Sequence, residues 1–322
     1  MIYDAIKNFQ EQFRYEPEIE NGDSWKRKKT YVVIGMGGSH LAADILKCWK
    51  PELSLFVHHD YDLPPFPDGF WKDAALIASS YSGNTEETLS AFEEAGTKNI
   101  ARSAVSIGGM LLASAKEANT PYVRLPDAGI QPRLATGFMA KAILALMGEK
   151  GALREMSDLA GFFSPESFEE EGRALAKRIK GFVPVVYASE QNAALAENWK
   201  IKFNETGKIP SFWNTFSELN HNEMTGFDVK DATRSLSDQF MFLFLKDESD
   251  SPKIQKRMAI TAELYRARGF MVEEVVLSGK TALEKIFGAF ILGDWTAYYT
   301  AKGYGVEPEE VPMVEEFKKM IA

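Results

Sequence analysis

Alternation of short apolar runs with helical patterns is the feature that most constrains the fold of this chain. Between Thr30 and Leu146, runs that are apolar at nearly every position are each followed by a segment of helical periodicity. Such strands are buried on both faces, which is typical of parallel sheets covered by helices. The expected strands are 31–34, 53–57, 74–78, 103–107 and 120–123. Two expected helices follow the first and third of these strands and end near residues 49 and 96, and two more span 110–118 and 134–147. The pattern predicts an α/β fold in which a parallel sheet lies between two helix layers.

The same alternation returns in the second half of the chain. Its expected elements are strands 182–187, 240–245 and 271–277 and helices 192–203, 252–268, 282–299 and 311–320. The polar stretch 148–171 is interpreted as the joint between the halves. A shared order of elements without obvious sequence identity indicates an internal structural repeat. The expected domains are 1–25 (an N-terminal helical segment), 26–150, 165–305 and 306–322 (a C-terminal helix).

Charge and cysteine content exclude several classes of protein. The 322 residues contain 37 Lys plus Arg against 46 Asp plus Glu, a net charge of −9. This balance argues against nucleic-acid binding and against attachment to a membrane surface. The first 14 residues carry charges throughout, so we expect no signal peptide. Cys48 is the single cysteine, which allows no disulfide within the chain and fits a cytoplasmic protein.

The histidines give no support to a metal site. His58 and His59 are adjacent, His40 and His221 stand alone, and none has the spacing of a zinc ligand pair. The pair at 58–59 is interpreted as a strand end that meets a loop. We therefore expect no metal and no cofactor.

The first strand-to-helix turn is glycine-rich. Residues 35–39 read GMGGS, and glycines there let the backbone approach a ligand near a helix N-terminus. The alternative is a dinucleotide-binding turn. It is disfavoured because the turn is not a full GxGxxG fingerprint and no acidic residue clearly suits a ribose.

The second turn is rich in hydroxyl and amide side chains. Residues 79–88 read SSYSGNTEET and stand where a strand ends and a helix begins. Such a turn surrounds a phosphate with backbone amides and hydroxyl donors. A plain helix cap is the alternative, but one cap needs one such residue and five gather here, namely Ser79, Ser80, Ser82, Asn84 and Thr85. The turn contains no lysine, so it does not resemble the loop that binds nucleoside triphosphates.

These two turns resemble those of the sugar isomerase (SIS) domain. The whole chain resembles the bifunctional phosphoglucose/phosphomannose isomerases, which carry two such domains. The likeness covers essentially residues 25–320, and its most specific segments are 130–133 (IQPR), 204–210 (NETGKIP) and 218–223 (ELNHNE). The resemblance implies two αβα domains with parallel sheets, a homodimer and aldose–ketose isomerase activity on hexose 6-phosphates.

The resemblance also implies roles for individual residues. The substrate-binding positions that it implies are Gly37, Gly38, Ser39, Ser80, Ser82, Thr85, Arg133 and Thr296. Arg133 corresponds to the arginine that stabilises the reaction intermediate, Glu205 to the base and His221 to the ring-opening histidine. Lys302 is the best match for the family's lysine in the C-terminal segment. Thr296 is the candidate for the threonine linked to accepting both epimers.

The chemistry requires residues of this kind independently of the resemblance. Interconverting an aldose and a ketose phosphate moves one proton between C1 and C2, and a single carboxylate such as Glu205 can take and return it. Arg133 can pair with the developing enediolate, and His221 can exchange a proton with the ring oxygen. The alternatives are a solvated helix glutamate, a structural salt bridge and a buried histidine, respectively.

Several functional questions stay open at the level of sequence. A different SIS isomerase acting on glucosamine phosphates and a non-catalytic sugar-phosphate sensor are alternatives. Binding alone does not require the pair Glu205 and His221, which favours an enzyme. The expected partners are a phosphorylated hexose and a second copy of the chain with shared active sites. Whether glucose, mannose or both epimers are accepted, and whether His221 serves its own or the partner's site, is left open.

Overall fold

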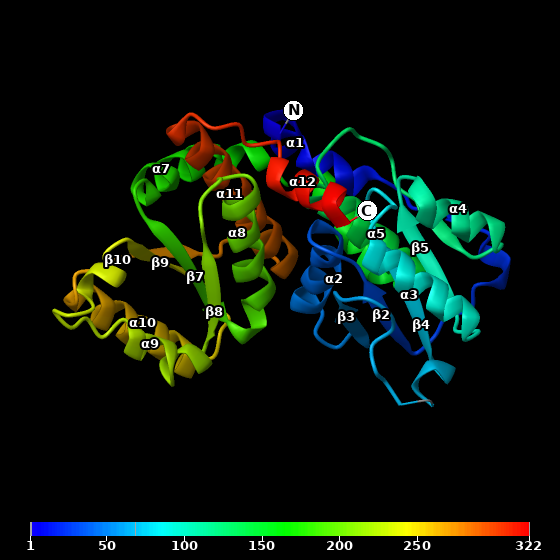
Figure 1. Ribbon diagram of the computed structural model, residues 1–322, viewed down its shortest axis with the longest axis horizontal. Coiled ribbons are helices and arrows are strands. Elements are labelled where there is room, and N and C mark those ends of the chain that lie inside the picture. Colours follow the sequence, from blue (N-terminus) through cyan, green and yellow to red (C-terminus); the bar gives the residue numbers. More distant parts are fainter. Residues whose placement is uncertain (1, 68, 322) are drawn as a thin grey trace. The chain divides into compact units, whose positions relative to one another are not determined.

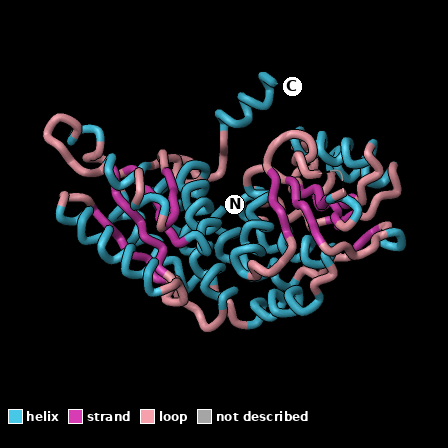
Figure 2. The backbone as a smooth tube through the Cα atoms, turned by 90° about the horizontal axis from the view of Figure 1, so that it is seen from below, coloured by secondary structure: helices cyan, strands magenta, loops and turns pink. Residues whose placement is uncertain are grey.

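The computed structural model describes residues 2–67 and 69–321. The chain forms two compact units. The N-terminal unit contains Lys7–Phe163, and the C-terminal unit combines the residues up to Ile6 with the chain from Ser164 onward. Each unit has its own sheet, and helices flank the strands in both (Figures 1 and 2). The expected domain limits stay predictions.

The sheet of the N-terminal unit has six strands in the order β1-β6-β5-β4-β2-β3. Strands β2 to β6 all pair in parallel with their neighbours, whereas the two-residue strand β1 pairs antiparallel with β6. Its strands are β1 Ile19–Glu20, β2 Thr30–Ile34, β3 Leu55–His58, β4 Ala74–Ser79, β5 Arg102–Ser106 and β6 Tyr122–Arg124. Every residue of β4 is buried, as its apolar sequence predicts.

Helices cover both faces of this sheet. They are α2 Gly38–Trp49, α3 Glu86–Thr97, α4 Gly109–Glu117, α5 Thr136–Met147 and α6 Lys150–Asp158. Helices α2 and α5 contact each other, and α3 contacts α4. Because parallel strands are joined by right-handed crossovers, α2 and α3 leave the sheet on opposite faces. Cys48 is buried on α2 as a free thiol.

The sheet of the C-terminal unit has four parallel strands in the order β10-β9-β7-β8. Its strands are β7 Val183–Ser189, β8 Phe212–Phe216, β9 Phe240–Lys246 and β10 Met271–Val276. Its main helices are α7 Glu169–Ile179, α8 Ala193–Glu205, α9 Glu223–Gly226, α10 Pro252–Ala267, α11 Ala282–Tyr304 and α12 Pro312–Ile321, with the short α1 Ile2–Lys7 beginning the chain. An aromatic cluster that includes Tyr187, Phe242 and Tyr265 forms the core on one face of the sheet.

The two sheets repeat one topology, which confirms the predicted internal repeat. In the first four parallel strands of each unit, the second strand lies at an edge, the first beside it, and the third and fourth follow (Figure 1). The order β3-β2-β4-β5 therefore corresponds to β8-β7-β9-β10. In such sheets the chain changes direction between the first and third strands, and ligands bind beyond the carboxyl ends of these strands. This point lies after β2 and β4 in one unit and after β7 and β9 in the other.

Two segments differ from the sequence interpretation. The stretch 212–216, where no strand was expected, is the edge strand β8, whose last residue, Phe216, is buried in the core. The stretch 148–171, interpreted as a joint, contains all of helix α6 and the start of α7. Helix α7 packs closely on α11, since a Cβ at Gly172 would lie 2.5 Å from the Trp295 side chain.

None of the helices in the described part of the chain combines the length and the apolar character needed to cross a membrane.

Candidate active site

Two turns at the carboxyl edge of the N-terminal sheet lie against each other. The glycine-rich turn follows β2, and the hydroxyl-rich turn follows β4. The backbone N–H of Tyr81 donates to Ser39 Oγ at 3.1 Å, and Ser79 Oγ donates to the Ser39 carbonyl at 3.2 Å. A Cβ at Gly35 would lie 2.8 Å from the Ser79 carbonyl oxygen, so the two backbones touch where the strand order reverses.

Arg133 belongs to the same cluster. It lies in the 3-10 helix η4 Pro132–Leu134, and the backbone of η4 packs directly on Gly38. A Cβ at Gly38 would lie 2.6 Å from the Arg133 backbone nitrogen, so only glycine allows this approach. The Arg133 residue is 3% exposed, and its Nη1 donates to Gln131 Oε1 at 3.5 Å. The structure thus brings the predicted substrate-binding residues of this unit together.

The hydroxyl-rich turn offers donors to an anion. Ser80 Oγ and Thr85 Oγ1 are 2.8 Å apart, and the backbone N–H of Gly83 donates to Ser80 Oγ at 3.1 Å. Ser82 is exposed and accepts a bond from the Asn84 backbone at 3.3 Å. Thr85 is the N-cap of α3, but its side chain makes no capping hydrogen bond. The first N–H groups of α3 and the positive end of its dipole are therefore available to a phosphate.

The neighbouring turn after β5 holds the hydroxyl-rich turn in place. Gly83 has a φ of +75°, and a Cβ there would lie 2.0 Å from the Gly108 carbonyl oxygen. Its own carbonyl accepts from Leu111 N at 2.9 Å, and Asn84 Oδ1 accepts from Met110 N at 3.0 Å. The shape of the turn is thus fixed by the protein before any ligand binds.

Glu205 is the last residue of helix α8 in the C-terminal unit. The helix ends there because Gly207 follows, and its N–H donates back to the Lys202 carbonyl at 2.9 Å. Lys208 has a φ of +58°, and its ammonium donates to the Glu205 carbonyl at 2.6 Å. The Glu205 side chain is half-buried. A carboxylate at a helix end, with a fixed backbone and partial access to solvent, suits a base that acts on a bound ligand.

A buried ion pair that the sequence analysis missed anchors α8. Lys202 Nζ lies 2.8 Å from Asp294 Oδ2 of α11, and these side chains are 1% and 2% exposed. Burial lowers the pKa of Lys202 to about 8, and the charge of Asp294 opposes this shift. Trp199 Nε1 adds a bond to the Ala289 carbonyl of α11 at 2.9 Å. The available sequence signal was an aspartate within the otherwise apolar stretch 286–295 of α11.

The other predicted residues of the C-terminal unit differ in exposure. Thr296 is fully buried on α11, and its hydroxyl donates to the Leu292 carbonyl at 2.7 Å. Lys302 is exposed on the same helix, with Nζ 5.7 Å from the centroid of the Tyr298 ring. His221 is exposed and follows the 3-10 helix η8 Glu218–Asn220. Packing of α8 on α11 brings together the helices of Glu205 and Thr296, whereas His221 comes from a separate segment after β8.

The corresponding edge of the C-terminal sheet carries carboxylates in place of the hydroxyl-rich turn. Strand β7 is followed by Glu190, and β9 is followed by Asp247 and Asp250. Lys285 pairs with Asp247 at 2.8 Å, Thr215 donates to Glu190 at 2.8 Å, and burial raises the pKa of Asp250. Carboxylates repel a phosphate, so the repeat retains the strand topology but not a second hydroxyl-rich turn.

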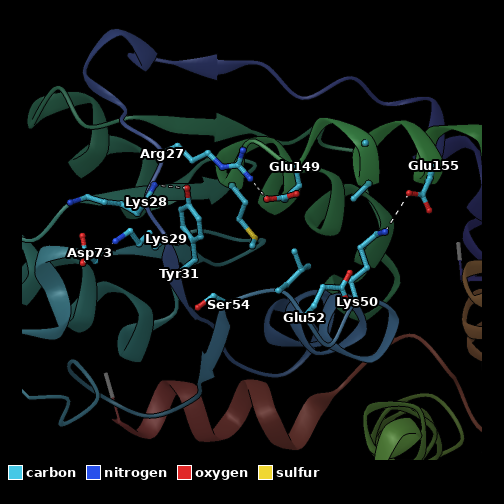
Figure 3. Close-up of a pocket in the computed structure, with 14 residues that line it drawn as sticks. Arg27, Lys28, Lys29, Tyr31, Lys50, Glu52, Ser54, Asp73, Glu149 and Glu155 are labelled. Carbon is cyan, nitrogen blue, oxygen red and sulfur yellow. Dashed lines mark hydrogen bonds and ion pairs between the residues drawn. The ribbon is translucent and has the colours of Figure 1, made fainter.

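A cavity of about 870 Å³ lies at the other edge of the N-terminal sheet, beside the start of β2 (Figure 3). It is lined by basic residues, but acidic neighbours pair with them. Arg27 pairs with Glu149, and Lys50 pairs with Glu155 at 3.3 Å. Its four basic lining residues face four acidic ones, so the cavity offers no net positive charge for a phosphate. Among the described residues no three His, Cys, Asp or Glu side chains are grouped as metal ligands.

The repeated α/β units and the hydroxyl-rich turn define a protein of the SIS-domain class. The sequence pattern of the bacterial phospho-glucose isomerase C-terminal SIS domain matches residues 168–321. The chain is 32% identical to the bifunctional phosphoglucose/phosphomannose isomerase of Aquifex aeolicus, over 99% of this chain and 97% of that protein. It is 30% identical to the enzyme of the same name from Caldicellulosiruptor bescii, over 100% and 99% of the two chains. The chain belongs to the family of bifunctional phosphoglucose/phosphomannose isomerases.

Solved structures agree on the fold. The glucosamine-6-phosphate deaminase of Thermotoga maritima superposes with a TM-score of 0.70 at 15% identity, covering 97% of each chain. This likeness concerns the arrangement of the two units' elements and confirms the predicted α/β fold with two SIS-type domains.

Proposed function

We propose that the protein interconverts glucose 6-phosphate, mannose 6-phosphate or both with fructose 6-phosphate through a cis-enediol intermediate. Membership of the isomerase family supports the reaction class. The observation that carries the substrate class is the hydroxyl-rich turn before α3, whose helix N-terminus has no side-chain cap. Hydroxyl and N–H donors without a nearby lysine suit a single phosphate monoester.

The reaction divides among a few side chains. His221 passes a proton to the ring oxygen as its bond to C1 breaks, and the C1 hydroxyl gives up its proton to become the aldehyde. The carboxylate of Glu205 takes the proton from C2 of the open aldose, and the C1 carbonyl oxygen takes up a proton, which gives the enediol. Glu205 returns its proton to C1 while the C2 hydroxyl gives up its proton and becomes the ketone carbonyl, so no atom is gained or lost. Arg133 stabilises the negative charge that develops on the enediolate oxygens, and Lys302 supplies a further positive charge.

Three finer points belong to the same proposal. The enzyme works as a homodimer with shared active sites, in the cytoplasm. The buried Thr296 contributes to the acceptance of both epimers through the packing of α11 rather than by a free hydroxyl, because this hydroxyl is bonded to its own helix. The buried free thiol of Cys48 is compatible with a reducing compartment.

A direct assay tests the proposed reaction. Purified protein is incubated with glucose 6-phosphate or mannose 6-phosphate, and fructose 6-phosphate is measured with a coupled enzyme after prolonged dialysis against EDTA. We expect turnover with at least one of the two substrates and full activity after dialysis. No conversion of either aldose phosphate would refute the proposal. Activity that is lost on dialysis and restored by zinc or manganese would assign the protein to a metal-dependent class of isomerase.

A further inference from the structure

The last helix of the chain carries an apolar face with no cover. Helix α12, all of whose residues are described, contains no buried residue. Met313, Phe317 and Met320 are 82%, 59% and 79% exposed. Their spacing of four and three residues places them on one side of the helix, and Val314 and Ile321 extend the same face. An apolar face of this size on one short element is typical of an interaction surface.

The charges of α12 are separated along its axis. Glu315 and Glu316 lie in its first half, and Lys318 and Lys319 lie in its second half. Two copies of this helix in antiparallel contact place the lysine end of one beside the glutamate end of the other. A parallel contact would place like charges together. Charge complementarity therefore favours a second copy of the chain, in antiparallel orientation, as the occupant of the apolar face.

We propose that α12 pairs antiparallel with α12 of a second copy and forms part of the dimer interface. This inference rests on the homodimer of the proposed function and identifies one of its contact surfaces. An isologous contact of this kind is closed, because each helix offers the same face to the other. Phe317 lies near the middle of the helix and therefore near the two-fold axis of the pair.

Hydrogen bonds from one lysine connect the loop before α12 to the backbone of the proposed catalytic base. The loop between α11 and α12 contains Glu310. The ammonium of Lys208 donates both to the Glu310 carbonyl and to the Glu205 carbonyl. The loop at Glu310 and the C-terminal end of α8 are thus both bonded to the Lys208 ammonium. Pairing of α12 with a second copy restrains the loop at Glu310 and, through Lys208, the backbone of Glu205.

Dilution of the wild type and of a double variant in the apolar face of α12, called the seam variant, tests the pairing. We compare the wild type with Phe317→Glu/Met320→Glu by sedimentation velocity over a range of concentrations. Loss of two buried apolar side chains per copy, with added like charges, should raise the dimer dissociation constant by more than about a hundredfold. The control is Ile260→Glu, which adds a negative charge to an apolar residue that is 44% exposed on helix α10 rather than on α12. It should dimerise as the wild type does.

Disulfide trapping tests the orientation. Met313→Cys and Met320→Cys chains are prepared separately, mixed and oxidised mildly. Antiparallel pairing brings residue 313 of one helix opposite residue 320 of the other, so only the mixture should yield a covalent dimer. The wild type, whose Cys48 is buried, is the control and should give none.

The outcomes separate this inference from the proposed dimer. A monomeric wild type overturns both. A seam variant that stays as dimeric as the wild type overturns the pairing through α12 but not the proposed dimer. A covalent dimer formed by Met313→Cys chains alone overturns the antiparallel orientation. Because no residue of α12 is buried, the seam variant should melt at the wild-type temperature in dilute solution, where both are monomeric.

Discussion

At the scale of single residues, Glu205 is the position on which the proposed chemistry depends most. Its backbone is fixed by the end of α8 and by Lys208, while its side chain keeps partial access to solvent. Glu205→Gln preserves the shape and removes the basicity. A positioned base contributes roughly 10²–10⁴-fold to the rate, so turnover should fall by at least about a hundredfold with little change in KM. Steady-state kinetics with fructose 6-phosphate measures both.

The matched control is Glu197→Gln, the same change two turns earlier on the same helix. It should retain wild-type turnover. If Glu205→Gln keeps more than about a tenth of wild-type turnover, Glu205 is not the base.

Phosphate binding is a second prediction at this scale. Ser82→Ala with Thr85→Ala removes two hydroxyls from the turn before α3. Hydrogen bonds to a charged group are worth about 1.5–3 kcal/mol each, so KM for the sugar phosphate should rise by tens-fold or more. Isothermal titration with inorganic phosphate should show the same loss of affinity and, for the wild type, one site per chain, because the corresponding edge of the C-terminal sheet is acidic.

Thr97→Ala with Ser114→Ala is the control, since it removes one threonine and one serine hydroxyl from helices α3 and α4, away from the turn. Its phosphate affinity should match that of the wild type. Unchanged affinity in the Ser82 and Thr85 double variant, or two phosphates per wild-type chain, would contradict the assignment.

At the scale of elements, Gly38 joins helix α2 to the backbone that carries Arg133. An added methyl group there would lie 2.6 Å from the Arg133 nitrogen, so η4 must move away from the turn. We expect Gly38→Ala to lower turnover by at least about tenfold, because small displacements of a positioned charge are costly. Melting temperature should also fall. Gly151→Ala is the control: its methyl group meets no neighbour within 4 Å in α6, and it should be neutral or slightly stabilising.

The ion pair Lys202–Asp294 locks two helices together. Lys202→Met leaves a buried carboxylate without its cation, which typically costs about 3–5 kcal/mol. The double variant Lys202→Met/Asp294→Leu removes both charges and should recover most of this loss. Urea unfolding followed by circular dichroism measures the free energies. A single variant as stable as the wild type would show that the pair does not hold α8 on α11.

The pH dependence of stability gives an independent check on this pair. The pKa of Lys202 is lowered by burial to about 8, below the ordinary lysine value of about 10.4. Between these values the unfolded chain binds more protons than the folded one, so the free energy of unfolding rises with pH. The double variant lacks this group. The wild type should therefore gain stability relative to the double variant from pH 8 to pH 10, and change little relative to it between pH 6 and pH 7.5.

Elements with a strong local pattern were predictable from sequence. Strand β4 is apolar at almost every position, and α10 begins at a proline and repeats its apolar residues with helical spacing, so both were found within a residue or two. The edge strand β8 was missed because its exposure does not alternate: it changes steadily from exposed Phe212 to buried Phe216, so no two-residue period marks the strand. Helix α7 begins in a charged stretch, and its apolar positions are recognisable only when Trp295 of α11 packs on Gly172.

In the candidate site, too, sequence predicted the local motifs but not the contacts between distant segments. The two turns after β2 and β4 carry their signal within a few residues, so sequence identified them. That Arg133 approaches Gly38, about 95 residues away in the chain, follows from tertiary packing that no local pattern encodes. The pairing of Lys202 with Asp294 is likewise formed between distant helices. Roles for Glu205, His221, Lys302 and Thr296 came from family resemblance and stay predictions.

At the scale of the whole molecule, one topology appears twice with different surface chemistry. The N-terminal unit has hydroxyls and free helix N–H groups where its strand order reverses, whereas the C-terminal unit has carboxylates there. Such divergence is expected of a repeat in which one unit binds the phosphate. The C-terminal unit contributes instead the end of α8 and the exposed segment that carries His221. Its proposed role is therefore proton transfer rather than phosphate binding.

Exposure of His221 permits it to act in a neighbouring chain, and mixing two inactive variants tests this. We expect Glu205→Gln and His221→Ala homodimers each to be inactive, for different reasons. After reversible dissociation and random re-pairing, half of the dimers are mixed. If His221 serves the partner's Glu205, one of the two sites in a mixed dimer contains both wild-type residues, so about a quarter of wild-type activity should return. If heterodimers form, as shown by a tag on one variant, and no activity returns, His221 acts within its own chain. Re-pairing each variant with itself is the control and should restore none.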